Sequence, residues 1–205
     1  MADNRDALSE DARLRFEALY ERRASWDIGR PQPALLRQLA QGLVRGSVLD
    51  VGCGTGDNAL AVAAAGLAVW GIDIVPGAIA VACAKARERS LPFGRFLVAD
   101  VLGLETLGMQ FDTAIDSGLF HALSDAERPW FVRSLGQVLR PTGLYHMLGF
   151  SELEPGAIGP RRLCEDEIRG SFASGWQVLR LERTRFETNI HPGGAHAWLA
   201  TIERR

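Results

Sequence analysis

The sequence predicts an α/β protein built on a mostly parallel, doubly wound sheet, and three observations carry that prediction. Short apolar runs alternate with helix-like segments five times along the chain. The first of these apolar runs ends in three glycines within five positions, which is typical of a tight strand-to-helix turn. Two strand-like runs joined by a Gly-rich turn close the sequence, which indicates a hairpin at the edge of the sheet.

Length and composition are those of one globular domain. The chain has 205 residues, 47% of them apolar and 23% charged, with a formal charge of −2. That charge gives no broad basic field for nucleic acid or anionic lipid. The sequence opens without a secretory signal or a membrane-spanning run, so we expect a cytoplasmic protein. Cys53, Cys83 and Cys164 are far apart and odd in number, and we expect reduced thiols.

The amino-terminal part predicts two helices ahead of the first strand. Leu8, Ala12, Phe16 and Leu19 recur at helical spacing. The segment SWDIGRPQP then breaks the pattern, and Pro33 suits the first turn of a second helix.

Strand and helix alternate through the centre of the chain. Gly66 is placed to end an Ala-rich helix, and Ser124 and Glu127 have the spacing of a capping box. The expected helices span residues 8–24, 33–41, 57–66, 76–89, 124–139 and 164–174, and the expected strands span 47–51, 67–73, 94–100, 111–117, 144–151, 176–189 and 196–204. Together they predict a Rossmann-like seven-stranded sheet, mostly parallel, with one antiparallel edge strand from the C-terminal hairpin.

The glycine segment, VLDVGCGTG at 48–56, predicts a ligand site. Ligands of open parallel sheets bind beyond the carboxyl ends of the strands, where the strand order reverses. Asp73 ends the second strand 21 positions after Gly52, where an acid can accept both hydroxyls of a ribose. A tight turn without a ligand is the alternative interpretation, and Asp73 counts against it.

The glycine spacing separates two kinds of nucleotide-containing ligand. Dinucleotide sites space their glycines G-x-G-x-x-G and leave the next helix N-terminus clear for a pyrophosphate. This chain has Gly52, Gly54 and Gly56, with Asp57 at the start of the helix and Asp50 before the turn. Two carboxylates would repel a pyrophosphate and tolerate a cationic ligand with an amino group, such as a sulfonium with an amino-acid tail.

These residues resemble the class I S-adenosylmethionine-dependent methyltransferases over nearly the whole chain. The resemblance implies S-adenosylmethionine as cofactor, S-adenosylhomocysteine as product, and methyl transfer to a small molecule. It places the methionine portion on Gly52, Cys53 and Gly54, with Asp50 near its amino group. The implied cofactor residues on the other strand ends are Asp73 and Ile74 at the ribose, Asp100 and Val101 at the adenine, and Asp116 and Ser117 facing the methyl group.

The segment SWDIGRPQP also resembles the thiopurine and tellurite-resistance methyltransferases, in which it packs over the cofactor. Together with DSGLFHAL it is similar to actinobacterial methyltransferases of small heterocyclic toxins. Trp26 and Arg30 are therefore lid candidates, and the Trp26 ring could meet the sulfonium or could simply anchor the first helix in the core. The resemblance divides the single domain, 1–205, into helices and lid at 1–45, cofactor-binding core at 46–151, and acceptor loop, helix and hairpin at 152–205.

His121 is the candidate general base, because it follows the fourth strand and should overhang the methyl group. Asp116 is the second catalytic candidate. Packing or helix capping is the alternative for His121, and acidic acceptors would need no base. The residues expected to form the acceptor pocket are Trp26, Phe120, His121, Phe150, Arg161 and Arg162, although the two arginines could equally form a solvated face.

The remaining histidines predict no metal site. His146 lies inside a strand and reads as a core residue, and His191 and His196 flank the hairpin turn, where exposure is the default. The fourth strand lacks the Asn/Asp-Pro-Pro-aromatic ending that positions amide or adenine acceptors. We therefore expect an enzyme that methylates an O, S or N atom of a compact aromatic molecule, working as a monomer or homodimer. A nicotinamide-dependent oxidoreductase, a non-catalytic cofactor-binding protein and an RNA methyltransferase are the alternatives.

Overall fold

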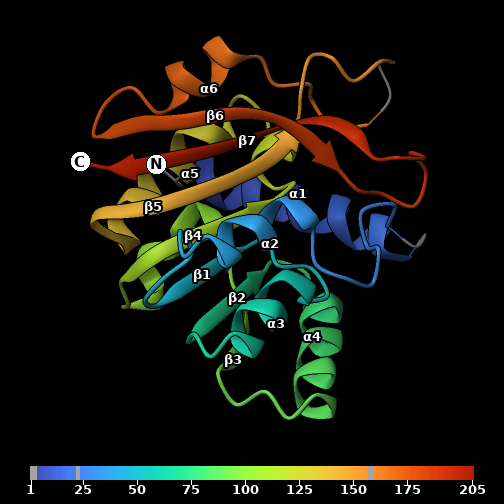
Figure 1. The fold of residues 1–205 in the computed structure, drawn as a ribbon. Helices are drawn as coiled ribbons and strands as arrows, with labels where there is room; N and C mark the ends of the chain where they lie inside the picture. The colour runs from blue at the N-terminus through green and yellow to red at the C-terminus, as the bar shows by residue number, and fades with distance from the viewer. Residues whose placement is uncertain (1–3, 22–23, 157–158) are drawn as a thin grey trace.

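A seven-stranded sheet with helices on both faces forms the protein (Figure 1). The computed structural model describes residues 4–21, 24–156 and 159–205. The strand order is β3-β2-β1-β4-β5-β7-β6. The strands are β1 (Val48–Val51), β2 (Val69–Asp73), β3 (Gly94–Val98), β4 (Phe111–Ser117), β5 (Leu139–Phe150), β6 (Trp176–Phe186) and β7 (Ala195–Arg204). The predicted fold class is confirmed.

The strand order reverses at β1, which creates the crevice for a ligand. The chain proceeds outward from β1 to β2 and β3, then returns to the other side of β1 with β4 and β5. Val51 is in register with Ile72 on one side and with Asp116 on the other. The carboxyl ends of β1, β2 and β4 therefore lie side by side at the topological switch point.

The C-terminal hairpin completes the sheet in a way that the sequence only partly predicts. The turn before β7 contains Gly193 and Gly194, both at a φ of +79°. β7 is antiparallel to both of its neighbours, β5 and β6. The antiparallel strand thus lies one position inside the edge, and β6 forms the edge itself.

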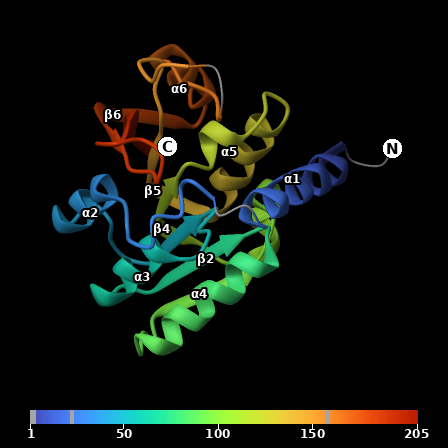
Figure 2. The same ribbon diagram turned by 90° about the vertical axis from the view of Figure 1, so that its right-hand side faces the viewer.

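Helices cover the two faces of the sheet, with α3 and α4 on one side and α5 on the other (Figure 2). The capping box is confirmed, since the Ser124 amide donates to the Glu127 carboxylate at 2.6 Å and the Glu127 amide donates to Ser124 Oγ at 3.3 Å. The helical elements are α1 (Asn4–Glu21), α2 (Pro33–Ala40), α3 (Asp57–Ala64), α4 (Pro76–Glu88), α5 (Glu127–Val138), α6 (Glu165–Ser171) and the short 3-10 helices η1 (Val101–Leu107) and η2 (Phe120–Ala122).

Some boundaries differ from those predicted. β5 begins at Leu139, five residues before the predicted start, because Leu139 already pairs with Phe111 and a bulge follows. β3 ends at Val98, so Asp100 lies past the strand and caps η1 instead. α1 ends at Glu21, and residues 22–23 of the predicted helix lie outside the described residues.

Removing the Phe131 ring should destabilise the fold strongly. Phe131 on α5 is fully buried and contacts the Phe120 and Tyr145 rings at centroid distances of 6.2 and 5.9 Å. We expect Phe131→Ala to lower the free energy of unfolding by about 3–5 kcal/mol in urea titrations. The control, Phe93→Ala, removes a ring that is 52% exposed and should change little. Equal effects of the two substitutions would contradict the assignment of Phe131 to the core.

Candidate cofactor and acceptor site

The glycine turn after β1 has a backbone conformation that residues with side chains rarely adopt. Gly52, Gly54 and Gly56 have φ values of +67°, +55° and +86°. A methyl group on Gly54 would come within 2.8 Å of the Tyr20 hydroxyl, and one on Gly52 would meet Leu119 at 3.1 Å. The protein's own packing therefore explains part of the glycine pattern. The evidence for a bound ligand comes instead from the carboxylates around the turn.

Asp73 ties the end of β2 to the glycine turn. Its carboxylate accepts the amide of Gly54 and the amide of Val75, both at 2.9 Å. The side chain is buried, which raises its pKa, while those amides act in the opposite direction. Ile74, the next residue, is half-buried. Asp73 thus lies at the edge of the turn, where the sequence predicts a ribose site.

Asp50 is a buried carboxylate with no hydrogen-bond donor at normal geometry. It is fully buried on β1, and neither oxygen accepts a hydrogen bond of normal geometry. Burial raises its pKa well above the usual range, the nearby Asp116 carboxylate adds to the shift, and the backbone amide of Ala59 near it lowers the pKa only in part. A buried carboxylate that the protein leaves unpaired is the feature expected of a group that meets an ammonium ion.

Asp116, on β4, organises the loop that follows it. Its carboxylate accepts the amides of Leu119 at 2.7 Å and Phe120 at 3.0 Å, and the Tyr145 hydroxyl at 2.5 Å. It is fully buried, which raises its pKa to about 6 despite those three donors. Ser117, the last residue of β4, is half-buried. The contacts of Asp116 are those of a residue that positions the His121 loop.

The adenine end that the resemblance implies lies under the first helix. Asp100 accepts the amide of Leu102 at 2.8 Å, and Val101 is buried at the start of η1. The Ser9 hydroxyl of α1 donates to the other oxygen of Asp100. Helix α1 therefore reaches this end of the crevice.

Tyr20 on α1 is a site residue that sequence reasoning missed. Its hydroxyl lies against Gly54, and burial, with the Asp73 charge nearby, raises its pKa. Its ring packs edge-on against Trp26 at 5.8 Å. The available signal was its position four residues after Phe16, which places it on the same face of the predicted helix.

The segment around Trp26 is held between the glycine turn and the hairpin. Thr55 donates to the Asp27 carboxylate at 3.2 Å, and Asn189 donates to the Asp27 carbonyl at 2.8 Å. Trp26 is half-buried and packs on the apolar cluster that contains Phe150. Arg30 points outward, is 61% exposed and pairs with Glu187 at 2.7 Å. The structure therefore places Trp26 in the crevice and Arg30 on its outer rim.

Aromatic rings gather around His121, Phe150 and Phe186, on the side of the crevice where the sequence predicts the methyl acceptor, called the acceptor side below. His121 lies edge-on to Phe150 at 4.9 Å and stacks with Phe186 at 5.8 Å. The Arg162 guanidinium lies 5.7 Å from the centre of the Phe150 ring. His191 also contacts Phe150, at 5.7 Å, and is half-buried between Thr188 and Glu154, so the expectation that it is exposed is wrong.

Phe120 does not join this group. It is fully buried in the core beneath α5, with Phe172 at 5.4 Å and the Arg128 guanidinium at 5.0 Å from its ring. Its amide is held by Asp116, which turns the ring inward. The structure thus places Phe120 behind the acceptor side rather than in it.

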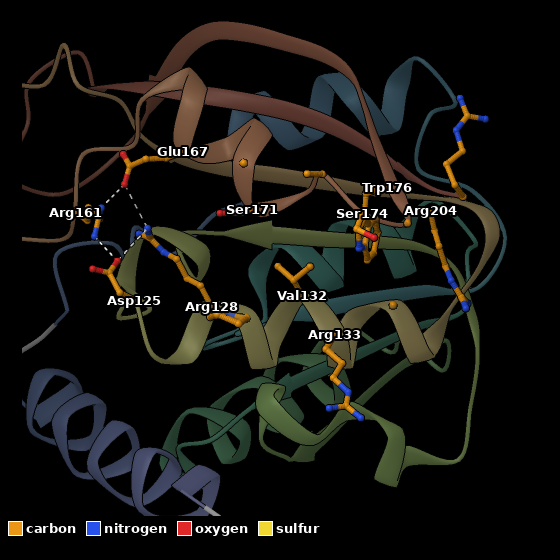
Figure 3. Close-up of a pocket in the computed structure, with 16 residues that line it drawn as sticks. Asp125, Arg128, Val132, Arg133, Arg161, Glu167, Ser171, Ser174, Trp176 and Arg204 are labelled. Carbon is orange, nitrogen blue, oxygen red and sulfur yellow. Dashed lines mark hydrogen bonds and ion pairs between the residues drawn. The ribbon is translucent and has the colours of Figure 1, made fainter.

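Arg161 points away from the acceptor side, into a pocket of about 820 Å³ between α5, α6 and the end of β7 (Figure 3). There it pairs with Asp125 at 2.5 Å and with Glu167, and Arg128 completes the ring of charges. Only the Arg161 amide reaches the site, donating to the His121 carbonyl at 3.2 Å. The side chains of Arg161 and Arg162 therefore lie on different faces of the loop, Arg161 with Asp125 and Glu167 and Arg162 against Phe150.

The prediction that Asp57 places an uncompensated negative charge at the start of α3 is wrong. Its carboxylate pairs with Lys85 at 2.7 Å and with Arg89 at 3.3 Å. Lys85 on α4 and Arg89 directly after it balance the charge at this helix N-terminus, so Asp57 does not repel a pyrophosphate as the sequence suggested. Discrimination against a dinucleotide rests on the glycine spacing and on Asp50.

Two kinds of feature are absent from the described residues: a metal site and a membrane-spanning helix. No group of three or more His, Cys, Asp or Glu side chains in them could hold a metal ion. No helix among them is both long and apolar enough to cross a membrane. His146 is buried in β5, with Thr201 and the Leu43 carbonyl as partners, which confirms its place in the core.

Asp116→Asn should change how stability depends on pH. The native pKa of about 6 exceeds the ordinary value of 3.8, so the native state binds the proton more tightly. The tighter proton binding of Asp116 adds about 3 kcal/mol to the free energy of unfolding. This stabilisation is fully present below the unfolded pKa and is lost as the pH rises through about 6. Urea unfolding between about pH 4 and pH 7 should show wild type losing stability relative to Asp116→Asn.

The control is Asp112→Asn. The Ser47 amide holds the pKa of Asp112 below its usual range. Ionised Asp112 therefore stabilises the fold at neutral pH, and this stabilisation is lost as the pH falls, which is the opposite of the dependence expected for Asp116. Parallel stability curves for wild type and Asp116→Asn would contradict the prediction.

Comparisons with known proteins agree with this geometry. Residues 48–143 match a methyltransferase domain family. A 2-heptyl-1-hydroxyquinolin-4(1H)-one methyltransferase from Mycobacteroides abscessus is 33% identical over 201 residues, which cover 92% of this chain and 88% of the relative. A solved structure reported for the conversion of a disulfide bond into a thioacetal group during echinomycin biosynthesis has a TM-score of 0.85 at 34% identity, covering 94% of this chain and 92% of the other.

A more distant structure shares the fold with its cofactor product in place. The magnesium protoporphyrin IX methyltransferase of Synechocystis PCC 6803, solved with bound S-adenosylhomocysteine, has a TM-score of 0.66 at 21% identity and covers 83% of this chain and 80% of its own. The resemblance drawn from VLDVGCGTG and the strand-end acids is confirmed. The chain belongs to the class I S-adenosylmethionine-dependent methyltransferases.

Proposed function

We propose that this methyltransferase modifies an ionisable oxygen or sulfur of a compact aromatic or heterocyclic molecule, with a ring nitrogen as the third candidate atom. The observation that carries the proposal is the group of rings on the acceptor side, His121, Phe150 and Phe186, next to the Trp26 segment. The hydroxyquinolone acceptor named for the 33% identical relative is a flat heterocycle of this kind. The 34% identical structure supports sulfur as an alternative acceptor atom.

The cofactor is S-adenosylmethionine, which supplies an electrophilic methyl group on a sulfonium when bound. The unpaired, buried oxygens of Asp50 and the bare backbone of the turn fit this molecule. In our assignment, Asp50 faces its amino group and Asp73 its ribose hydroxyls. The further cofactor residues are Gly52, Cys53, Gly54, Ile74, Asp100, Val101, Ser117 and Trp26, with Tyr20 added and with Arg30 and Asp116 acting from outside direct contact.

The chain's own contribution to methyl transfer is alignment and the exclusion of water. In-line displacement at a sulfonium needs no acid for the leaving group, and orientation alone can supply roughly 7–11 kcal/mol of a barrier. Tyr20 and Trp26 close the crevice from α1 and the segment after it. Asp116 holds the loop that presents His121. The division into lid at 1–45, core at 46–151 and acceptor region at 152–205 follows these roles.

The setting of the reaction is also part of the proposal. We place the enzyme in the cytoplasm, as a monomer or homodimer, acting on free small molecules. A net charge of −2 supports this choice over a nucleic-acid substrate, because phosphate binding calls for a basic surface.

Asp73→Ala should abolish measurable binding of S-adenosylhomocysteine in calorimetry. The substitution removes the expected ribose acceptor and the bond that fixes the Gly54 amide. Asp112→Ala is the control, since that carboxylate holds the Ser47 amide at the other end of β4 and should leave binding intact. An unchanged dissociation constant for Asp73→Ala would remove the ribose assignment.

Radiolabelled methyl transfer across hydroxyquinolones, thiols, phenols and thiopurines should detect turnover with at least one acidic acceptor. Because orientation supplies most of the rate, flat acceptors should give higher kcat/KM values than flexible thiols of equal acidity. Tight cofactor binding with no turnover on the whole panel would indicate a non-catalytic binding protein instead.

A further inference from the structure

The two ring nitrogens of His121 have different environments. Nδ1 accepts a hydrogen bond from the backbone amide of Phe150 at 2.8 Å. Nε2 lies beside Gly118, directly after β4, where a methyl group on that glycine would approach it to 3.2 Å. Among the described residues, no hydrogen bond to Nε2 is found. The open side of the ring is therefore its Nε2 edge, at the carboxyl end of the sheet.

The Phe150 amide fixes the tautomer of His121. A neutral imidazole has one protonated nitrogen and one that accepts, and an amide can donate only to the latter. With Nδ1 accepting from Phe150, the proton of the neutral ring is on Nε2. The nitrogen that faces the acceptor side is thus a hydrogen-bond donor and has no lone pair with which to remove a proton.

The charges around the ring oppose its protonation. Burial, with the guanidinium groups of Arg162 and Arg128 adding to it, lowers the pKa of His121 to about 3. Protonating Nδ1 would also break the bond from Phe150 and place a third cation among the two arginines. His121 therefore stays neutral at physiological pH, and general-base catalysis by this residue is disfavoured twice.

The carboxylates near His121 already have other hydrogen-bond or ion-pair partners. Asp116 accepts from two amides and from Tyr145 on the β4 side. Across the Phe150 ring, Glu154 accepts the His196 amide at 2.6 Å and pairs with His191 at 3.4 Å. The Nε2 edge thus offers a neutral donor, and the nearby cation on its side is the Arg162 guanidinium against Phe150, because Arg128 is paired with Asp125 and Glu167 behind Phe120.

We propose that the methyl acceptor binds as an anion, with its ionised oxygen or sulfur accepting a hydrogen bond from His121 Nε2–H near the Arg162 guanidinium that lies against Phe150. This inference rests on the proposed function and names its substrate class: N-hydroxy heteroaromatics, acidic phenols and thiols, but not alcohols or amines. The acceptor loses its proton to solvent before the reaction. Its electron pair then forms the bond to the methyl carbon while the carbon–sulfur bond breaks, so anion and sulfonium give two neutral products without a base.

The first experiment separates a donor from a base at position 121. His121→Leu removes both functions, whereas His121→Gln restores an N–H donor that cannot take up a proton. A hydrogen bond to a charged group corresponds to a loss of about 10- to 100-fold in kcat/KM for His121→Leu, and we expect His121→Gln to recover at least about tenfold of it. If both variants lose activity equally, the donor role is wrong.

Two controls accompany these variants. His146→Leu removes a fully buried imidazole that contacts Thr201 and the Leu43 carbonyl instead of Phe150, and it reports the effect of losing a core histidine. Calorimetric binding of S-adenosylhomocysteine shows whether each variant is folded. Should a His121 variant fail this test, the wild-type measurements below decide the proposal alone.

The second experiment uses wild-type enzyme and ring-substituted 1-hydroxyquinolin-4-ones with hydroxyl pKa values between about 7 and 9, away from the titration of Asp116. We expect kcat/KM to rise about tenfold per pH unit up to the pKa of each acceptor, so that the break moves with the acceptor. A break at one pH for every acceptor would report an enzyme base and overturn the proposal.

A spectroscopic measurement needs no turnover. In the complex with S-adenosylhomocysteine, the absorption spectrum of the bound acceptor should be that of its ionised form one pH unit below its solution pKa. A spectrum of the neutral form would refute anionic binding. Failure of the proposed function is distinct, because wild type would then transfer methyl groups to no member of the acceptor panel.

Discussion

The turn from β1 into α3 is the constraint on which the rest of the site depends. Its backbone takes left-handed conformations at Gly52, Gly54 and Gly56, and other elements close on the space that side chains would fill. Leu119 approaches from the loop after β4, and Tyr20 approaches from α1. Asp73 then fixes the turn to β2 through the Gly54 amide. One stretch of bare backbone thus sets the spacing of the loop after β4, helix α1 and Asp73.

Electrostatics divides the crevice into two halves. Around the glycine turn, burial raises the pKa values of Asp50, Asp73 and Asp116, and the Asp116 and Asp73 charges raise that of Asp50 further, which suits a cation. Around His121, the Arg162 guanidinium lies against the Phe150 ring, and its charge suits an anion. The two halves therefore favour opposite charges on either side of the expected reaction centre, and their attraction would bring the two reactants together.

The sequence predicts the sheet, its strand ends and the glycine turn because these follow from local patterns: alternation, Gly spacing and a capping box. The features that it misses depend on how the helices pack in three dimensions. Tyr20 reaches the site only because α1 packs across the glycine turn, and the charge of Asp57 is balanced only because α4 places Lys85 against it. Arg161 and Arg162 are neighbours in sequence, yet they face opposite sides of one loop. Periodicity cannot separate such residues outside regular elements.

The position of β7 within the sheet has a consequence for the order of folding. β6 and β7 form a local hairpin, and this hairpin joins the sheet only when β7 pairs with the more distant β5. Non-local pairings of this kind are slow to form. Phe186 ends β6 and forms one wall of the ring cluster around His121. The ring cluster around His121 is therefore complete only after the non-local pairing of β7 with β5 has formed.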